Sequence, residues 1–293
     1  MSSIDAPVLP AALRLGAVHL TVADLRRAVA WYERALGLRV HRRDRSRVML
    51  GDGNEAVIVL HADPDARRAR RTAGLYHYAL LYPSREELAR AAVRLTAPKK
   101  RLTETTTQIQ GASDHETHEA LYLTDPEGNG IELAADRPRA AWPDDLGYAG
   151  GPKPLDLESL KATVADEEPS ALVGEGLRVG HLHLHVGSVD DALGFYRDVI
   201  GFEEQANIGT AAFVSAGGYH HHLGFNVWNG VGVGPPADHA VGLRSWTVQL
   251  PERADLDALR ARLDAAGHPV EPTERGFVVR DPWSTVMTVV AAP

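Results

Sequence analysis

The stretch LGAVHLTVADLRRAVAWYERALGLRV, residues 15–40, has a second copy in VGHLHLHVGSVDDALGFYRDVIGFEE, residues 179–204. The two copies align without a gap, so the chain contains an internal repeat. In the first copy Val18, Leu20 and Val22 alternate with other residues, which indicates a strand with one buried face. The repeat therefore begins each half of the chain with the same kind of strand.

A helix is expected after each of these strands. Asp24 in the first copy and Ser188 in the second can cap its start, and Gly37 and Gly201 suit the left-handed position at its end. Apolar residues recur at helical spacing in the first copy and form a stripe that can be buried: Leu25, Ala28, Val29, Tyr32 and Leu36.

A second, weaker unit follows each copy. GLYHYALLYPSREELARAAVRL, residues 74–95, resembles GLRSWTVQLPERADLDALRARLDAAG, residues 242–267, because each is a strand, a proline and an amphipathic helix. Each unit ends in a hairpin around an Asp-Pro turn, at residues 125–126 and 281–282. We therefore predict an α+β fold of four βαβββ modules, paired into an N-terminal half and a C-terminal half.

The segment between the halves is rich in proline, glycine and acidic residues, which is typical of a linker. We place an N-terminal domain of two modules at residues 1–140, the linker at 141–176 and a C-terminal domain of two modules at 177–293. One short helix is expected in the linker, around residues 155–164.

Composition excludes several classes of function. A net charge of −8 and a pI near 5.9 argue against nucleic-acid binding, and the basic run DARRARRTAG, residues 65–74, is short enough to be an exposed loop. No apolar run approaches the roughly 20 residues that a membrane-spanning helix needs. With no secretory signal visible, we expect a cytoplasmic protein. The absence of cysteine leaves His, Asp, Glu or water to hold any metal.

Polar residues gather in HETHEALYLTDPEGNGIEL, residues 115–133. Strand alternation places Tyr122 and Glu132 on one face of this hairpin, and the other face is apolar: Leu121, Leu123, Ile131 and Leu133. An ionised glutamate within a sheet is costly unless a charge or a metal compensates it.

Two strand histidines can supply that compensation. His19 and His77 stand at equivalent positions of two repeated units, and Glu132 follows in the last strand of the second unit. Each residue alone could be an ordinary core or surface residue. Together, two imidazoles and one carboxylate form the facial triad that is typical of non-haem Fe(II) oxygenases.

These motifs resemble the vicinal oxygen chelate superfamily, and more closely its two-domain extradiol catechol dioxygenases. The resemblance covers about residues 14–135 and 178–291. Residues 115–132 are similar to the family signature, in which a histidine precedes Leu-Tyr, Asp-Pro, a glycine and a glutamate ligand, although Ser113 departs from the pattern. The resemblance implies two half-open barrel domains, with His19, His77 and Glu132 as ligands of Fe(II), Mn(II) being possible.

The resemblance also implies roles for four further residues. His115 and Tyr122 would lie next to bound substrate and dioxygen, as catalytic and substrate-binding groups. His61 is the nearest candidate for the acid–base histidine of the family, and as a strand-end residue it could instead face solvent. His118 shares the parity of Tyr122, so it could reach the substrate at the cavity mouth or stand in a solvated loop.

The second half departs from the triad, because Ser245 stands where His77 does and Thr288 where Glu132 does. It is nevertheless rich in histidine, and those side chains could form a second metal site, a wall of the substrate pocket or a vestigial cavity: His181, His183, His185, His220, His221 and His222. We expect the vestigial cavity.

The resemblance implies ring cleavage of a catecholic substrate by O2, in a homo-oligomer. A non-oxidative enzyme of the same fold, such as an isomerase, epimerase or lyase acting on a metal-bound enediolate, is the rival prediction. A non-catalytic protein that binds a small molecule is the third. Oxygen consumption separates the first two, and metal content separates an enzyme from a binding protein.

Overall fold

The computed structural model describes residues 8–97 and 107–292. The first module comprises β1 (Arg14–Leu15), β2 (Val18–Val22), α1 (Leu25–Leu36), β3 (Arg39–Arg43), β4 (Arg47–Gly51) and β5 (Ala56–Ala62). After the short β6 (Arg67–Arg68), the second module comprises β7 (Gly74–Tyr82), α2 (Arg85–Thr96), β8 (Gly111–Asp114), β9 (His118–Thr124) and β10 (Gly130–Asp136).

The linker contains η1 (Arg139–Ala141), β11 (Lys153–Pro154) and α3 (Leu157–Ala162), and this last helix confirms the short one expected there. The third module comprises β12 (Arg178–His185), α4 (Val189–Leu193), the π-helical η2 (Gly194–Ile200), β13 (Glu203–Asn207), β14 (Ala211–Ser215) and β15 (Leu223–Asn226). The fourth comprises β16 (Ala240–Leu250), α5 (Arg253–Ala265), β17 (Glu271–Pro272), β18 (Gly276–Arg280) and β19 (Val286–Ala291).

The start and end signals act as the sequence predicts. The Asp24 carboxylate accepts a hydrogen bond from the Arg27 backbone N–H at 2.9 Å, and the Ser188 hydroxyl caps α4 in the same way. Gly37 and Gly201 end the two helices with φ of 72° and 95°, a left-handed conformation that glycine adopts without steric cost. The α+β fold of four modules is confirmed.

The modules pair differently from the expected N-terminal and C-terminal halves. In what we call the central sheet, modules two and three join through antiparallel β7 and β12, and the strand order is β11-β8-β9-β10-β7-β12-β15-β14-β13. In the terminal sheet, modules one and four join through antiparallel β2 and β16, in the order β3-β4-β5-β2-β16-β19-β18-β17. The predicted domain of modules one and two is therefore not assembled as one sheet.

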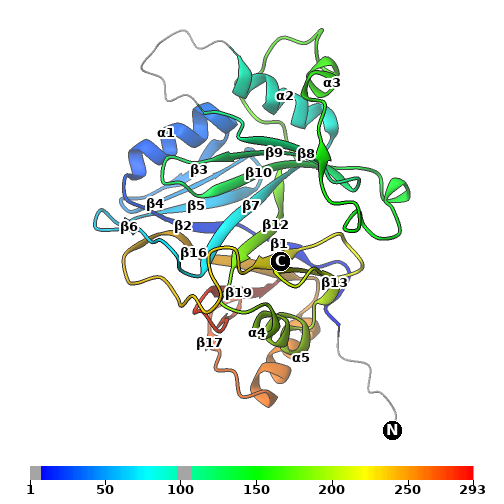
Figure 1. The fold of residues 1–293 in the computed structure, drawn as a ribbon. Coiled ribbons are helices and arrows are strands. Elements are labelled where there is room, and N and C mark those ends of the chain that lie inside the picture. Colours follow the sequence, from blue (N-terminus) through cyan, green and yellow to red (C-terminus); the bar gives the residue numbers. More distant parts are fainter. Residues whose placement is uncertain (1–7, 98–106, 293) are drawn as a thin grey trace.

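Strand β1 pairs with both β12 and β16 and so connects the two sheets. Figure 1 shows α1 and α2 in the upper part of the molecule and α4 and α5 in the lower part. Within residues 8–97 and 107–292 no helix is long and apolar enough to cross a membrane.

Both Asp-Pro turns anchor a helix of the neighbouring module. The Tyr32 hydroxyl on α1 donates to Asp125 at 2.9 Å, and the repeat-related Tyr196 hydroxyl donates to Asp281 at 2.9 Å. Each carboxylate also accepts backbone N–H groups of its own turn, and burial raises the pKa of both acids. Because buried polar groups need such partners, these contacts fix how module one packs on module two and module three on module four.

Candidate metal centre

Three adjacent strands of the central sheet bring a carboxylate and two imidazoles together. In the parallel β7–β10 pair, His77 is opposite Gly130, so His77 and Glu132 point to the same face of the sheet. Strand β12, on the other side of β7, contributes His181. Glu132 Oε2 lies 3.2 Å from His77 Nε2 and 3.2 Å from His181 Nε2.

All three side chains are buried, and Glu132 is only 2% exposed. Burial alone would raise the pKa of Glu132, but the facing His181 and a hydrogen bond from His118 hold that pKa well below its usual value. Burial lowers the pKa of His77 to about 3. The cluster is thus an ionised carboxylate beside a neutral imidazole, and these are the forms that bind a metal ion.

The shape of the cluster fits a metal ion. His77 Nε2 is buried and forms no hydrogen bond, although a Glu132 oxygen lies 3.2 Å away, because the two atoms are not aligned for one. The His77 and His181 rings are 5.5 Å apart and inclined at 66°. With bonds of about 2.0–2.2 Å to each ligand, neighbouring ligand atoms lie about 3 to 3.5 Å apart. An ion between these atoms would give the orphaned nitrogen its partner.

His19, predicted to be the third ligand, lies elsewhere. Strand β2 belongs to the terminal sheet, where His19 pairs with Val59 of β5 and Ser245 of β16. Its Nδ1 is 3.0 Å from Nε2 of His61, the predicted acid–base catalyst. Burial lowers the pKa of both histidines to about 4. The two predictions are corrected for one reason: module one pairs with module four, so neither residue reaches Glu132.

The other predicted residues do gather around the cluster. His115, His118 and Tyr122 line a cavity of about 440 Å³ together with His77 and Glu132. His115 Nε2 lies 2.7 Å from the Tyr122 hydroxyl. Burial lowers the pKa of His115 to about 4, whereas burial and the nearby Glu132 raise the pKa of Tyr122 well above 10. At neutral pH a proton acceptor therefore faces a proton donor.

The alternatives for His118 are now decided. Its Nε2 donates to Glu132 Oε1 at 3.1 Å, and its Nδ1 lies 2.9 Å from the Thr117 hydroxyl. The ring is 2% exposed and is stacked between His115 and His220, at centroid distances of 4.5 and 4.4 Å. His118 is therefore not in a solvated loop, and it orients the carboxylate of the cluster.

The second half takes part in the site, and a wall of the substrate pocket, one of the alternatives for its histidines, fits the structure better than the expected vestigial cavity. His181 completes the cluster, while His183, His220 and His221 line the same cavity. His183, which the repeat aligns with His19, lies opposite His77, and its Nε2 is 2.9 Å from the Asn226 amide nitrogen. The run of three histidines on one face of β12 indicated this role in the sequence, but the interpretation as a vestigial cavity gave it no function.

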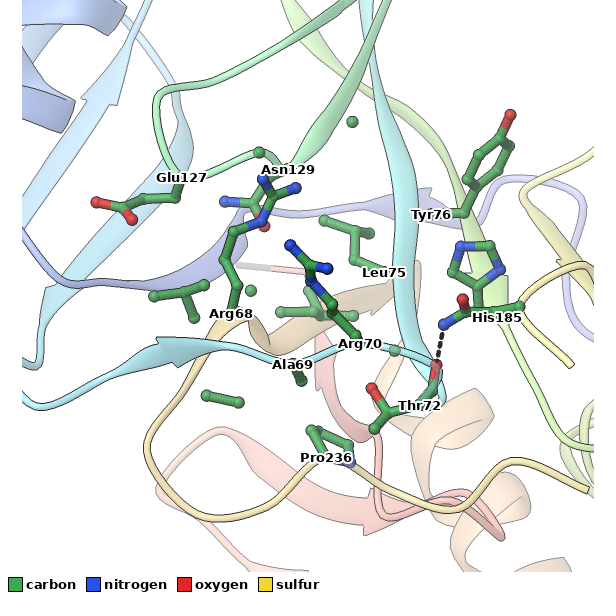
Figure 2. Close-up of a pocket in the computed structure, with 18 of the residues that line it drawn as sticks. Arg68, Ala69, Arg70, Thr72, Leu75, Tyr76, Glu127, Asn129, His185 and Pro236 are labelled. Carbon is green, nitrogen blue, oxygen red and sulfur yellow. Dashed lines mark hydrogen bonds between the residues drawn. The ribbon is translucent and has the colours of Figure 1, made fainter.

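A second hollow, of about 850 Å³, adjoins this cavity. Tyr76, His77 and Tyr122 line both hollows. Figure 2 shows Arg68 and Arg70 of the basic run extending into the larger one, beside Asn129. The run is anchored, because β6 pairs with β16 and the Asn229 amide donates to Thr72 O at 2.7 Å. The expected exposed loop is thus one wall of the larger hollow.

Comparisons with known proteins agree with this fold. Residues 14–133 and 178–288 match the family described as the Glyoxalase/Bleomycin resistance protein/Dioxygenase superfamily. The chain is 39% identical over 277 residues to a catechol-2,3-dioxygenase of Bacillus subtilis (strain 168). The aligned residues cover 92% of this chain and 94% of that relative.

Two solved structures share the fold at low identity. A candidate dioxygenase from Bacillus subtilis subsp. subtilis str. 168 has a TM-score of 0.64 and 14% identity, over 96% of this chain and 86% of that one. Glyoxalase I from Zea mays has a TM-score of 0.55 and 15% identity, over 96% and 92%. With the family match and the 39% identical relative, the chain therefore belongs to the glyoxalase/bleomycin resistance protein/dioxygenase superfamily.

Proposed function

We propose that this protein is an extradiol dioxygenase that cleaves the ring of a catecholic substrate with O2. The observation that carries the proposal is the buried cluster of Glu132, His77 and His181, with its orphaned imidazole nitrogen. The relative named catechol-2,3-dioxygenase supports the choice of reaction.

His77, Glu132 and His181 would hold Fe(II), with Mn(II) as the other candidate. Three protein ligands leave positions open for exogenous ones, as in the 2-His-1-carboxylate oxygenases. When bound, such an ion supplies the activation of a catechol and O2 beside one another. Glu132 Oε1 accepts the His118 N–H, so Oε2, which faces the Nε2 atoms of His77 and His181, is the oxygen that would bind the ion.

His115 would accept a proton during the reaction, and Tyr122 would donate a hydrogen bond. A neutral His115 imidazole can accept a proton from a catechol hydroxyl, and its lowered pKa keeps it neutral across the physiological range. The Tyr122 hydroxyl, whose pKa is raised, stays protonated and can donate a hydrogen bond to an oxygen of the substrate. Both side chains lie in the wall of the 440 Å³ cavity, where burial reduces their contact with water.

The experiment is a matched pair of variants loaded with Fe(II) under anaerobic conditions. His181→Ala should lose bound metal, measured by elemental analysis, together with O2 uptake and formation of the yellow ring-fission product from catechol. His19→Ala removes a similarly placed strand histidine from the terminal sheet and should keep all three. Retention of metal by His181→Ala, or its loss in His19→Ala, would overturn the ligand assignment.

The non-oxidative rival uses the same fold and the same ligands. A wild-type protein that binds one metal per chain but consumes no O2 with any catechol would favour it. The homo-oligomer and the cytoplasmic location stay predictions, and size-exclusion chromatography with light scattering checks the first.

A further inference from the structure

Building on the proposed function, we propose that the cavity selects catechols with an uncharged, apolar substituent. Three side chains at its mouth would make this selection: Tyr76 from β7, Ile208 from the β13–β14 turn and Trp228 from the segment after β15. The second half of the chain supplies two of these three residues, Ile208 and Trp228, and would thereby take part in substrate selection.

The wall of the cavity contains no cation. Among the described residues that line the 440 Å³ cavity there is no lysine or arginine, and Glu132 is the only carboxylate. Away from the metal cluster the wall is mostly apolar or aromatic: Leu146, Tyr148, Pro152, Ile208, Phe213 and Trp228. A carboxylate on the substrate would be desolvated there without a counter-charge and would approach Glu132, which makes its binding unfavourable.

The mouth exposes large apolar side chains where a substituent would pass. Ile208 is 57% exposed, Trp228 52% and Tyr76 40%. Single exposed apolar residues are ordinary on protein surfaces, but several that converge on one cavity mark a ligand-binding surface. A substituent that extends from the ring to the mouth would cover all three.

Two of the three side chains pack as a fixed aromatic wall. The Tyr76 and Trp228 rings are 5.5 Å apart and perpendicular, and both rings contact buried His183, at 5.2 and 5.5 Å. The Trp228 backbone N–H donates to Asn226 Oδ1 at 3.0 Å, which ties the segment to the end of β15. The wall is therefore in place before a ligand binds, so little ordering of side chains is needed on binding.

Ile208 is held by the β13–β14 hairpin. Its backbone N–H donates to Ala211 O at 2.9 Å, closing the β13–β14 turn. His183 and Phe213, whose rings are 5.6 Å apart, also line the cavity. Aromatic rings thus line the cavity from Trp228 at the mouth to His183, which lies opposite His77 of the cluster.

Arginines are present nearby but face the larger hollow. Arg68, Arg70 and Arg244 line the 850 Å³ hollow and none of them lines the smaller cavity. Within the described part of the chain, no carboxylate lies within 4.0 Å of these guanidinium groups. An anionic catechol would be attracted to that hollow, so a carboxylated substrate is the sharpest competitor for the proposal.

The test compares kcat/KM for 4-ethylcatechol, catechol and 3,4-dihydroxybenzoate. We expect the ethyl compound to exceed the carboxylated one by at least about tenfold, the scale by which an apolar pocket discriminates one small group. Trp228→Ala should lower the ratio of kcat/KM for 4-ethylcatechol over catechol by about tenfold on the same scale. Val231→Ala, which removes an 83% exposed apolar side chain outside the cavity, should leave the ratio unchanged.

Each result counts for or against the proposal. A preference for 3,4-dihydroxybenzoate, especially one that Arg70→Gln abolishes, would overturn it, as would a ratio that Trp228→Ala does not change. If no catechol is turned over, the proposed function fails. Calorimetric binding of 4-ethylcatechol and 3,4-dihydroxybenzoate to wild type and Trp228→Ala then still decides the selectivity. Equal affinities of the wild-type protein for 4-ethylcatechol and 3,4-dihydroxybenzoate would refute the proposed selectivity.

Discussion

The hydrogen bond from His118 to Glu132 makes a specific prediction about metal affinity. We propose the substitution His118→Phe, because phenylalanine keeps an aromatic ring between His115 and His220 while it removes the Nε2–H that contacts Glu132 Oε1 at 3.1 Å. The packing of the stack is then largely preserved, and the hydrogen bond is the main change.

The magnitude follows from the charge on the acceptor. A hydrogen bond to a charged group contributes about 1.5–3 kcal/mol, and each 1.4 kcal/mol corresponds to about a factor of ten in affinity. The metal Kd should therefore rise by about 10- to 100-fold, the range seen when the outer partners of metal ligands are removed. Competition with a chelator of known affinity, followed by calorimetry, measures this change.

His222→Phe is the matched control. His222, like His118, is a buried histidine, but it lies in the second half, and its Nδ1 accepts from the Ala216 backbone N–H rather than contacting Glu132. It should keep the wild-type Kd. If His118→Phe binds metal within twofold of wild type while its circular dichroism is unchanged, His118 does not orient the ligand carboxylate and the reasoning is wrong.

Two further predictions concern stability. Arg137 hydrogen-bonds Asp114 and holds the pKa of that carboxyl below its usual value of 3.8. This contribution to stability is therefore complete above pH 3.8 and is lost as the pH falls through the lower pKa of the folded state. Arg137→Met should therefore lower the free energy of unfolding in urea at pH 7, with a smaller difference near pH 3; an equal difference at both pH values would contradict this. A Cβ at Gly130 would lie 2.2 Å from Tyr76 O, so Gly130→Ala should strain the β7–β10 pair and cost about 1–3 kcal/mol in thermal unfolding. Gly194→Ala has open space and a helical φ of −53°, so it should be neutral or stabilising; a similar loss in both variants would point to a cause other than the clash.

Local structure followed closely from the residues. The repeat, the caps at Asp24 and Ser188 and the glycine stops at Gly37 and Gly201 all depend on interactions within a few positions along the chain, and the structure has them as predicted. The parity argument for Tyr122 and Glu132 held for the same reason, since the two residues lie directly opposite in the β9–β10 pair. Short-range rules are sufficient for such features.

The arrangement of the modules required information that short-range rules do not contain. A repeat tells which strands are equivalent, but it does not tell which equivalent strands meet. Strand β7 pairs with β12, and β2 pairs with β16, so each first strand lies antiparallel to the first strand of another module. The repeat alone would equally allow β2 to pair with β7. The choice depends on the linker and on long-range packing such as the contact of Arg39 with Val173 O at 2.9 Å.

The consequence for the site is that equivalent positions have unequal chemistry. In the central sheet, Glu132 lies opposite the residue two positions after His77, and in the terminal sheet His61 lies opposite the residue two positions after His19. The same frame is therefore built twice, but the terminal sheet has an imidazole where the central sheet has its carboxylate. Without that carboxylate, the neutral pair of His19 and His61 hydrogen-bonds to itself. The candidate metal site thus follows from which first strand stands beside β7: β12 brings His181 to Glu132, whereas His19 lies in the other sheet.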